Sequence, residues 1–184
     1  ISRNILKSPV PERRPGQSAY RNGDNQGGRL RLFFALWPAP GVARALHTWG
    51  RAAQAVTGGR LTREETIHLT LAFLGDVPGE RVAALIDCAR RVKGRAFGLA
   101  IDEGRRWEHN RIAWAGPREM PEALADLAAQ LDAHLKAGGF RTEKRDFKAH
   151  ISLVRRTEQG GVLPALPPVA WRADEFVLVR SSLS

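Results

Sequence analysis

The sequence predicts an α+β fold of two pseudo-symmetric lobes, each an antiparallel sheet with flanking helices, around a central cleft. Strand-like and helix-like segments alternate along residues 29–184. The order strand, helix, strand occurs twice, and each time the third segment contains a histidine and a hydroxyl residue two positions apart. A repeated order of this kind indicates an internal duplication. We therefore expect one domain with lobes at approximately 29–104 and 105–184, which can exchange strands.

The first repeat begins with the apolar run 31–37, which ends at Pro38 and is typical of a buried strand. Apolar residues then recur at helical spacing up to Gly58 and Gly59. The elements expected in this repeat are a strand at 31–37, a helix at 42–56, a strand at 67–74, a helix at about 79–93 and a strand near 97–101.

The second repeat begins with a strand at 111–115. A helix follows from Pro121, a residue favoured at helix N-termini, and closes at Gly138. The remaining expected elements are a strand at 147–154, a proline-rich loop at 160–168 and a strand at 175–179. Residues 1–28 mix proline, glycine and arginine without periodicity, which predicts a flexible N-terminal tail.

Composition excludes several classes of protein. The mean hydropathy is −0.32 and no apolar run approaches the roughly 18 residues of a membrane helix, so we expect no membrane association. Cys88 is the only cysteine, which favours a reducing, cytoplasmic location and rules out a disulfide framework. The net charge of +10 favours an anionic partner, although half of the excess lies in residues 1–31.

The two histidine-containing segments have the same pattern of faces. On a strand, alternate side chains point to opposite sides, so His68 and Thr70 share one face and His150 and Ser152 share another. The histidine and hydroxyl of each pair are about 7 Å apart along the backbone, at a rise of about 3.3 Å per residue. The polar faces of the two strands are expected to meet across the cleft.

Two imidazoles facing each other suit the hydrolysis of a cyclic phosphate. One histidine can take a proton from the attacking water while the other protonates the leaving oxygen, because imidazole titrates near neutral pH. Thr70 and Ser152 can donate hydrogen bonds to the non-bridging oxygens, where charge concentrates in the transition state. This scheme requires neither a metal ion nor another cofactor, and none of the five histidines has the spacing of a zinc site.

Residues 68–71 and 150–153 resemble the two His-x-Ser/Thr-hydrophobic motifs of the two-histidine phosphoesterase superfamily. They are most similar to its bacterial RNA 2′,3′-cyclic phosphodiesterase branch, the LigT or 2′-5′ RNA ligase-like family. The resemblance covers roughly residues 29–182 and extends around the motifs to residues 31–36, 72–75, 111–114 and 147–155. Relatives usually continue beyond the position of Ser184 into a final strand, so the resemblance implies a sheet with one strand fewer.

The resemblance also implies residue roles. His68 would be the proton donor and His150 the proton acceptor that activates water, while Thr70, Ser152 and Arg155 would hold the phosphate. The implied reaction converts RNA or nucleoside 2′,3′-cyclic phosphates to 2′-phosphates, with reversible 2′-5′ RNA ligation as a second activity. The expected partners are RNA ends or nucleotides bearing a 2′,3′-cyclic phosphate, and the protein is expected to be a monomer.

Two alternatives stay open at this point. One is a non-catalytic module that binds RNA ends or nucleotides, and the other is a phosphodiesterase for a different cyclic or 2′-5′-linked nucleotide. Phe33 and Trp114 are candidates to stack on a nucleobase, whereas strand parity assigns Phe73 to the core. We expect His109 to lie outside the site. The charged residues 141–145 are expected to be solvated, with guidance of an RNA backbone as the less favoured alternative.

Overall fold

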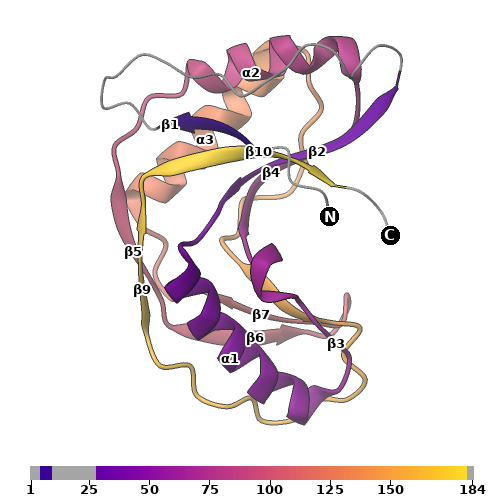
Figure 1. The fold of residues 1–184 in the computed structure, drawn as a ribbon, viewed down its shortest axis with the longest axis vertical. Helices are drawn as coiled ribbons and strands as arrows, with labels where there is room; N and C mark the ends of the chain where they lie inside the picture. Colours follow the sequence, from indigo (N-terminus) through magenta and orange to yellow (C-terminus); the bar gives the residue numbers. More distant parts are fainter. Residues whose placement is uncertain (1–4, 10–27, 182–184) are drawn as a thin grey trace.

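The structure, a computed structural model, describes residues 5–9 and 28–181. Its strands form two four-stranded antiparallel sheets and one two-stranded ribbon (Figure 1). The strands are β1 (Ile5–Pro9), β2 (Arg29–Leu36), β3 (Arg60–Leu61), β4 (Leu69–Pro78), β5 (Phe97–Ile101), β6 (Glu103–Trp107), β7 (Ile112–Gly116), β8 (Ile151–Arg155), β9 (Val169–Ala173) and β10 (Glu175–Ser181).

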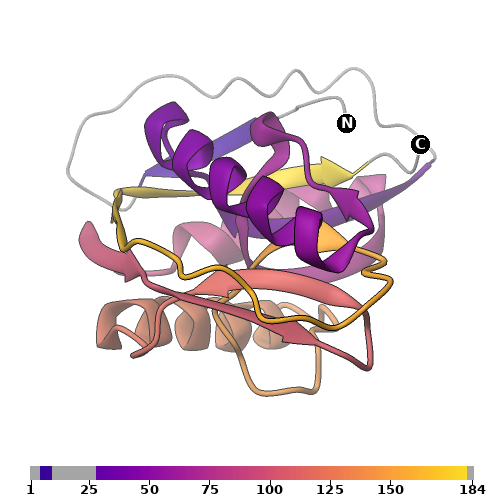
Figure 2. The same cartoon turned by 90° about the horizontal axis from the view of Figure 1, so that it is seen from below.

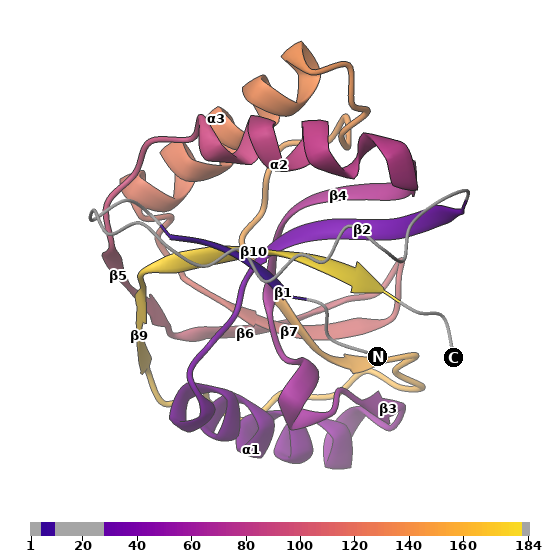
Figure 3. The same ribbon diagram turned by 45° about the horizontal axis from the view of Figure 1, so that its top comes forward.

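In the part of the chain that the structure describes, three α-helices and two short 3₁₀ turns flank the sheets. They are α1 (Pro40–Thr57), α2 (Val82–Arg90), α3 (Glu122–Ala137), η1 (Glu64–Thr66) and η2 (Gly79–Arg81). Helices α2 and α3 lie together on one side of the molecule and α1 lies on the other, with the sheets between them (Figures 2 and 3). Helix α3 packs on β4, and α1 packs on β7, β8 and β9. This arrangement confirms the predicted α+β class with antiparallel sheets and flanking helices.

The sheets mix strands from both halves of the chain. The first has the order β1-β10-β2-β4, so the C-terminal strand β10 joins two strands of the N-terminal half. The second has the order β3-β8-β7-β6 and takes β3 from the N-terminal half. Each four-stranded sheet contains one motif strand, β4 or β8, next to an apolar neighbour, β2 or β7.

The chain differs from expectation near its N-terminal end. Within the segment expected to be a flexible tail, residues 5–9 form β1, which pairs with β10 at the edge of the first sheet. The exposed N–H and C=O groups of an edge strand can accept an extended segment of this kind. The rest of the expected tail, residues 1–4 and 10–27, lies outside the described residues.

Besides β1, three strands of the described residues were not expected from the sequence: the two-residue β3, which pairs with β8, and the longer β6 and β9. Strand β6 pairs with β7 at the edge of the second sheet, and β9 pairs with β5. Residues of β6 are mostly polar or charged and partly exposed, so they lack the apolar alternation that identifies a strand.

Candidate active site

Both motif histidines lie at the residue immediately before a strand and make the same local contact. His68 precedes β4, and its Nδ1 is 2.7 Å from the carbonyl oxygen of Thr66. His150 precedes β8, and its Nδ1 is 2.8 Å from the carbonyl oxygen of Lys148. A carbonyl oxygen only accepts, so Nδ1 must donate in each case, and the neutral ring leaves the Nε2 lone pair free. Each histidine is therefore oriented to exchange a proton through Nε2.

Two aromatic rings enclose His68. Trp37 stacks on the imidazole with ring centroids 5.1 Å apart and planes at 11°, and the centroid of Phe33 is 4.8 Å away. Burial lowers the pKa of His68 from 6.5 to about 4, against the opposing hydrogen bond to Thr66. Arg155 and His150 add smaller electrostatic effects in the same direction as burial. His68 is therefore neutral in the free protein at pH 7.

His150 lies in a second aromatic environment. Its ring makes an edge-to-face contact with Trp107, with centroids 4.6 Å apart and planes at 65°, and the Trp114 ring centroid is 6.4 Å away. Burial lowers the pKa of His150, as do the charges of Arg155 and Arg145, while the hydrogen bond to Lys148 and the charge of Glu143 act in the opposite direction. Both imidazoles thus favour the neutral form.

The two motif strands also share a β-bulge at the fourth residue of the motif. In β8, Trp114 of the neighbouring strand pairs with Ser152 and Ile112 pairs with Arg155, which leaves Leu153 as the extra residue. Ile112 and Trp114 are two residues apart and lie on one face of β7, so Ser152 and Arg155 also share a face. Without the bulge, Arg155 would point away from Ser152.

The corresponding bulge in β4 changes the position of Phe73. Ala35 of β2 pairs with Thr70 and Phe33 pairs with Phe73, which leaves Leu71 as the extra residue. Phe73 therefore lies on the same face as Thr70 and lines the cleft, not the core as strand parity predicted. By its place after the motif, Phe73 is the counterpart of Arg155 in the other strand.

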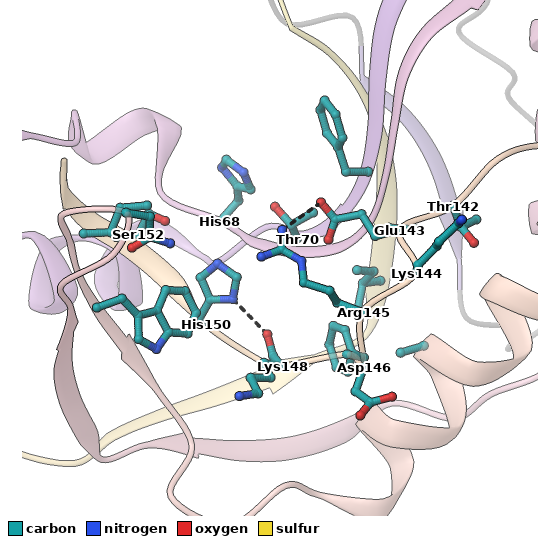
Figure 4. Close-up of a pocket in the computed structure, with 18 of the residues that line it drawn as sticks. His68, Thr70, Thr142, Glu143, Lys144, Arg145, Asp146, Lys148, His150 and Ser152 are labelled. Atoms are coloured by element: carbon teal, nitrogen blue, oxygen red, sulfur yellow. Dashed lines mark hydrogen bonds and ion pairs between the residues drawn. The ribbon is translucent and has the colours of Figure 1, made fainter. Parts of the chain in front are cut away.

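A cleft of about 930 Å³ lies between the motif strands, a volume suited to a nucleotide. The four motif residues that were predicted to form the site, together with Arg155, all line this cleft: His68, Thr70, His150, Ser152 and Arg155. In Figure 4, the His68 ring lies above the His150 ring, with Ser152 to the left of the two histidines and Thr70 to the right. The geometry thus brings together every residue predicted to hold phosphate or transfer a proton.

Arg155 brings a positive charge to the cleft from the same strand face as Ser152. Its pKa is lowered by burial and by the neighbouring charge of Arg60, yet a guanidinium remains protonated in proteins. Among the described residues it has no carboxylate within ion-pair distance. A partly buried cation of this kind favours an anion in the cleft.

The predicted base-stacking residues are placed differently from expectation. Phe33 and Trp114 are each only 8% exposed and do not line the cleft, because Phe33 packs against His68 and the β10 side chains and Trp114 is covered by Trp107. Trp107, on the unexpected strand β6, lines the cleft instead. His109, expected to lie outside the site, lines it as well. The signal in the sequence that could have indicated Trp107 as a site residue is its position four residues before the predicted strand 111–115.

Three other features of the described residues concern the cysteine, metal binding and membrane-spanning helices. Cys88 is a free, buried thiol. No cluster of three or more histidine, cysteine or acidic side chains in residues 5–9 and 28–181 is placed to hold a metal ion. Nor does any helix of the described part of the chain have the length and apolar character needed to cross a bilayer.

Two histidines, each immediately before a bulged strand and two residues before a hydroxyl side chain, share one cleft between two sheets. This arrangement defines a two-histidine phosphoesterase. The family model described as LigT-like phosphoesterase matches residues 36–114. The RNA 2′,3′-cyclic phosphodiesterase of Escherichia coli K12 is 32% identical over 84% of this chain and 88% of its own length. The enzyme of the same name from Archaeoglobus fulgidus is 30% identical over 68% of this chain and 72% of its own length.

Solved structures agree with the sequence comparison. The crystal structure of E. coli LigT complexed with 3′-AMP superposes with a TM-score of 0.79 at 30% identity, and the match covers 85% of this chain and 90% of that one. The chain belongs to the LigT-like phosphoesterase family.

Proposed function

We propose that this protein hydrolyses RNA or nucleoside 2′,3′-cyclic phosphates to 2′-phosphates without a metal ion, with reversible 2′-5′ RNA ligation as a second activity. The observation that carries the proposal is the pair of histidines with free Nε2 atoms on the two sides of one cleft. The names of the E. coli and A. fulgidus relatives support the substrate class. Monomeric state and cytoplasmic location stay predictions.

In the proposed reaction, Nε2 of His150 takes a proton from water as the water oxygen attacks phosphorus. The bond from phosphorus to the 3′ oxygen breaks, and His68 gives that oxygen its proton, so the phosphate remains on the 2′ oxygen. Thr70 and Ser152 donate hydrogen bonds to the non-bridging oxygens, and the positive charge of Arg155 stabilises the charge that builds up there.

His68 must be protonated before it can act as the acid. Its pKa of about 4 in the free protein leaves it neutral at pH 7. A negatively charged phosphate beside the ring favours the imidazolium form, so substrate binding raises this pKa. The proposal therefore couples substrate binding to proton uptake by His68.

Two substitutions test the assignment. His68→Ala and His150→Ala are each expected to lower turnover of a 2′,3′-cyclic nucleotide at least about a hundredfold, the usual contribution of acid–base catalysis. His134→Ala, in α3 and outside the cleft, is the matched control and is expected to retain wild-type turnover. Wild-type turnover in either of the first two variants would overturn the mechanism. Binding of phosphate-ended RNA with no product at any pH would indicate a binding module instead.

A further inference from the structure

We propose that the cleft contains a second phosphate site, formed by Arg31, Lys144 and Arg145, which binds the backbone phosphate preceding the cyclised nucleotide. We call these three residues the cationic arm. Its presence makes the preferred substrate an RNA 3′ end of two or more nucleotides, not a free cyclic nucleotide. This inference rests on the proposed function for the identity of the reacting group.

Two members of the cationic arm lie on the loop that leads from α3 to His150. Residues 142–148 of this loop line the cleft. Figure 4 shows the Arg145 side chain directed toward Thr70 and His150, and the Lys144 side chain extending along the loop toward Thr142. Arg145 lines the cleft together with His150, and its charge makes a small contribution to the lowered pKa of His150.

A hydrogen bond to α3 holds this loop in position. The hydroxyl of Thr142 donates a hydrogen bond to Asp132 of α3 at 2.5 Å, and the Lys136 ammonium bonds the other oxygen of the same carboxylate at 2.6 Å. Because Asp132 already has these two partners, its charge is compensated locally. It therefore leaves the positive charges at the top of the loop available to a ligand.

The third member, Arg31, comes from the opposite wall. It lies on β2 two residues before Phe33, on the face that the Leu71 bulge gives to Phe73. Its guanidinium carbon is 4.7 Å from the centre of the Phe73 ring, which fixes the charge over the cleft. Phe73 occupies in β4 the position that Arg155 occupies in β8. Because Arg31 stacks on Phe73, it supplies a cation on the β4 side of the cleft where Arg155 supplies one on the β8 side.

The charges of the cationic arm are poorly neutralised by the protein. Within residues 5–9 and 28–181, Lys144 has no carboxylate at ion-pair distance, and Arg145 has only the exposed Glu143 at 3.8 Å, with 79% of the arginine side chain exposed. Exposed pairs of this length contribute little. Uncompensated cations in a concave surface attract anions, and a polyanionic chain supplies them at regular spacing.

The part of the cleft beside His150 has a different chemistry. Trp107, whose ring centroid is 4.6 Å from that of His150, lines the cleft together with His109 and Asn110. An aromatic ring beside amide and imidazole groups suits a nucleobase. On this proposal the base of the cyclised nucleotide contacts Trp107, and the cationic arm is left for the sugar–phosphate chain that precedes it.

The test compares two substrates, adenosine 2′,3′-cyclic phosphate and a tri-adenylate ending in a 2′,3′-cyclic phosphate. We expect wild-type kcat/KM to be at least about tenfold higher for the trinucleotide at low salt. Lys144→Glu and Arg31→Gln are each expected to reduce the ratio of the two kcat/KM values about fivefold or more. The control is Arg172→Glu, an exposed arginine of β9 outside the cleft, which is expected to leave the ratio unchanged.

Salt dependence provides a second readout. The plot of log kcat/KM against log salt concentration is expected to be steeper for the trinucleotide, by about 0.7 for each backbone phosphate that the protein neutralises. Lys144→Glu is expected to remove most of this difference. Equal slopes for both substrates, or an equal loss of the ratio in Arg172→Glu, would overturn the cationic arm as a specific site.

Failure of the proposed function gives a different result. If neither substrate is hydrolysed, binding of tri-adenylate 3′-phosphate and of 3′-AMP is measured by competition. Tighter binding of the trinucleotide that is lost in Lys144→Glu would support the cationic arm although the proposed reaction had failed. Equal affinity of the two ligands, or affinity unaffected by Lys144→Glu, would overturn it.

Discussion

Replacement of His68 by glutamine is expected to change how the stability of the protein depends on pH. Burial beneath Trp37 and Phe33 lowers the pKa of His68 from 6.5 to about 4 in the folded state. In the unfolded chain the ring titrates near 6.5. As the pH falls below 6.5, the unfolded state therefore takes up a proton that the folded state does not, and this histidine lowers the free energy of unfolding.

The size of the effect follows from the shift. A shift of the pKa from 6.5 to about 4 corresponds to a loss of about 3 kcal/mol in the free energy of unfolding, reached at a pH low enough for His68 to be protonated in both the folded and the unfolded state. At pH 4.5 the same linkage gives about 2.5 kcal/mol, and at pH 7.5 the effect is negligible. Glutamine does not titrate and retains an N–H group that can reach the Thr66 carbonyl, so His68→Gln removes the pH-dependent contribution alone.

Urea unfolding at pH 7.5 and pH 4.5 measures the difference. We expect the wild type to lose about 2.5 kcal/mol more than His68→Gln between the two pH values. Other groups, including His150 and the carboxylates, titrate in both proteins and cancel in the comparison. Equal losses in the wild type and the variant would refute the conclusion that the aromatic enclosure keeps His68 neutral.

Three further predictions concern the aromatic residues, the pH profile and the packing. Trp107→Ala is expected to raise KM for cyclic nucleotides about tenfold through loss of base stacking, while Trp107→Phe retains most of the affinity; unchanged KM in the alanine variant would show that Trp107 does not contact the base. Because burial lowers the pKa of both histidines in the free protein, the form with one ring protonated and one neutral is most populated below pH 6.5. The optimum of kcat/KM should therefore lie below pH 6.5, and that of kcat should be higher because bound phosphate raises both pKa values; coincident optima above pH 7 would contradict this. Gly104→Ala would drive a methyl group into the ring of Trp49 and is expected to cost about 1–3 kcal/mol in thermal or urea unfolding, whereas Gly98→Ala, which enters open space, should cost far less.

The central part of the fold and site could be predicted because it is encoded locally. Apolar runs identified β2 and the motif strands, and helical spacing identified α1 and α3 to within a few residues at each end. The histidines and hydroxyls were predicted from their spacing and from the recurrence of this spacing in the repeated order of strands. Each of these signals depends on residues close together in the chain.

The rest depends on pairing between distant segments. The bulges at Leu71 and Leu153 arise from the register against β2 and β7, so no local pattern showed that Phe73 would turn toward the cleft. Strand β6 has too few apolar residues to be identified, and Trp107 was missed with it. The burial of Phe33 and Trp114 likewise depends on what covers them, which only the folded structure shows.

The most direct test of the account is identification of the product from an RNA ending in a 2′,3′-cyclic phosphate, incubated with the wild type in EDTA. We expect the cyclic phosphate to be converted to the 2′-phosphate at a rate unaffected by the chelator. Formation of the 3′-phosphate, or turnover that appears only when a divalent metal ion is restored, would contradict it.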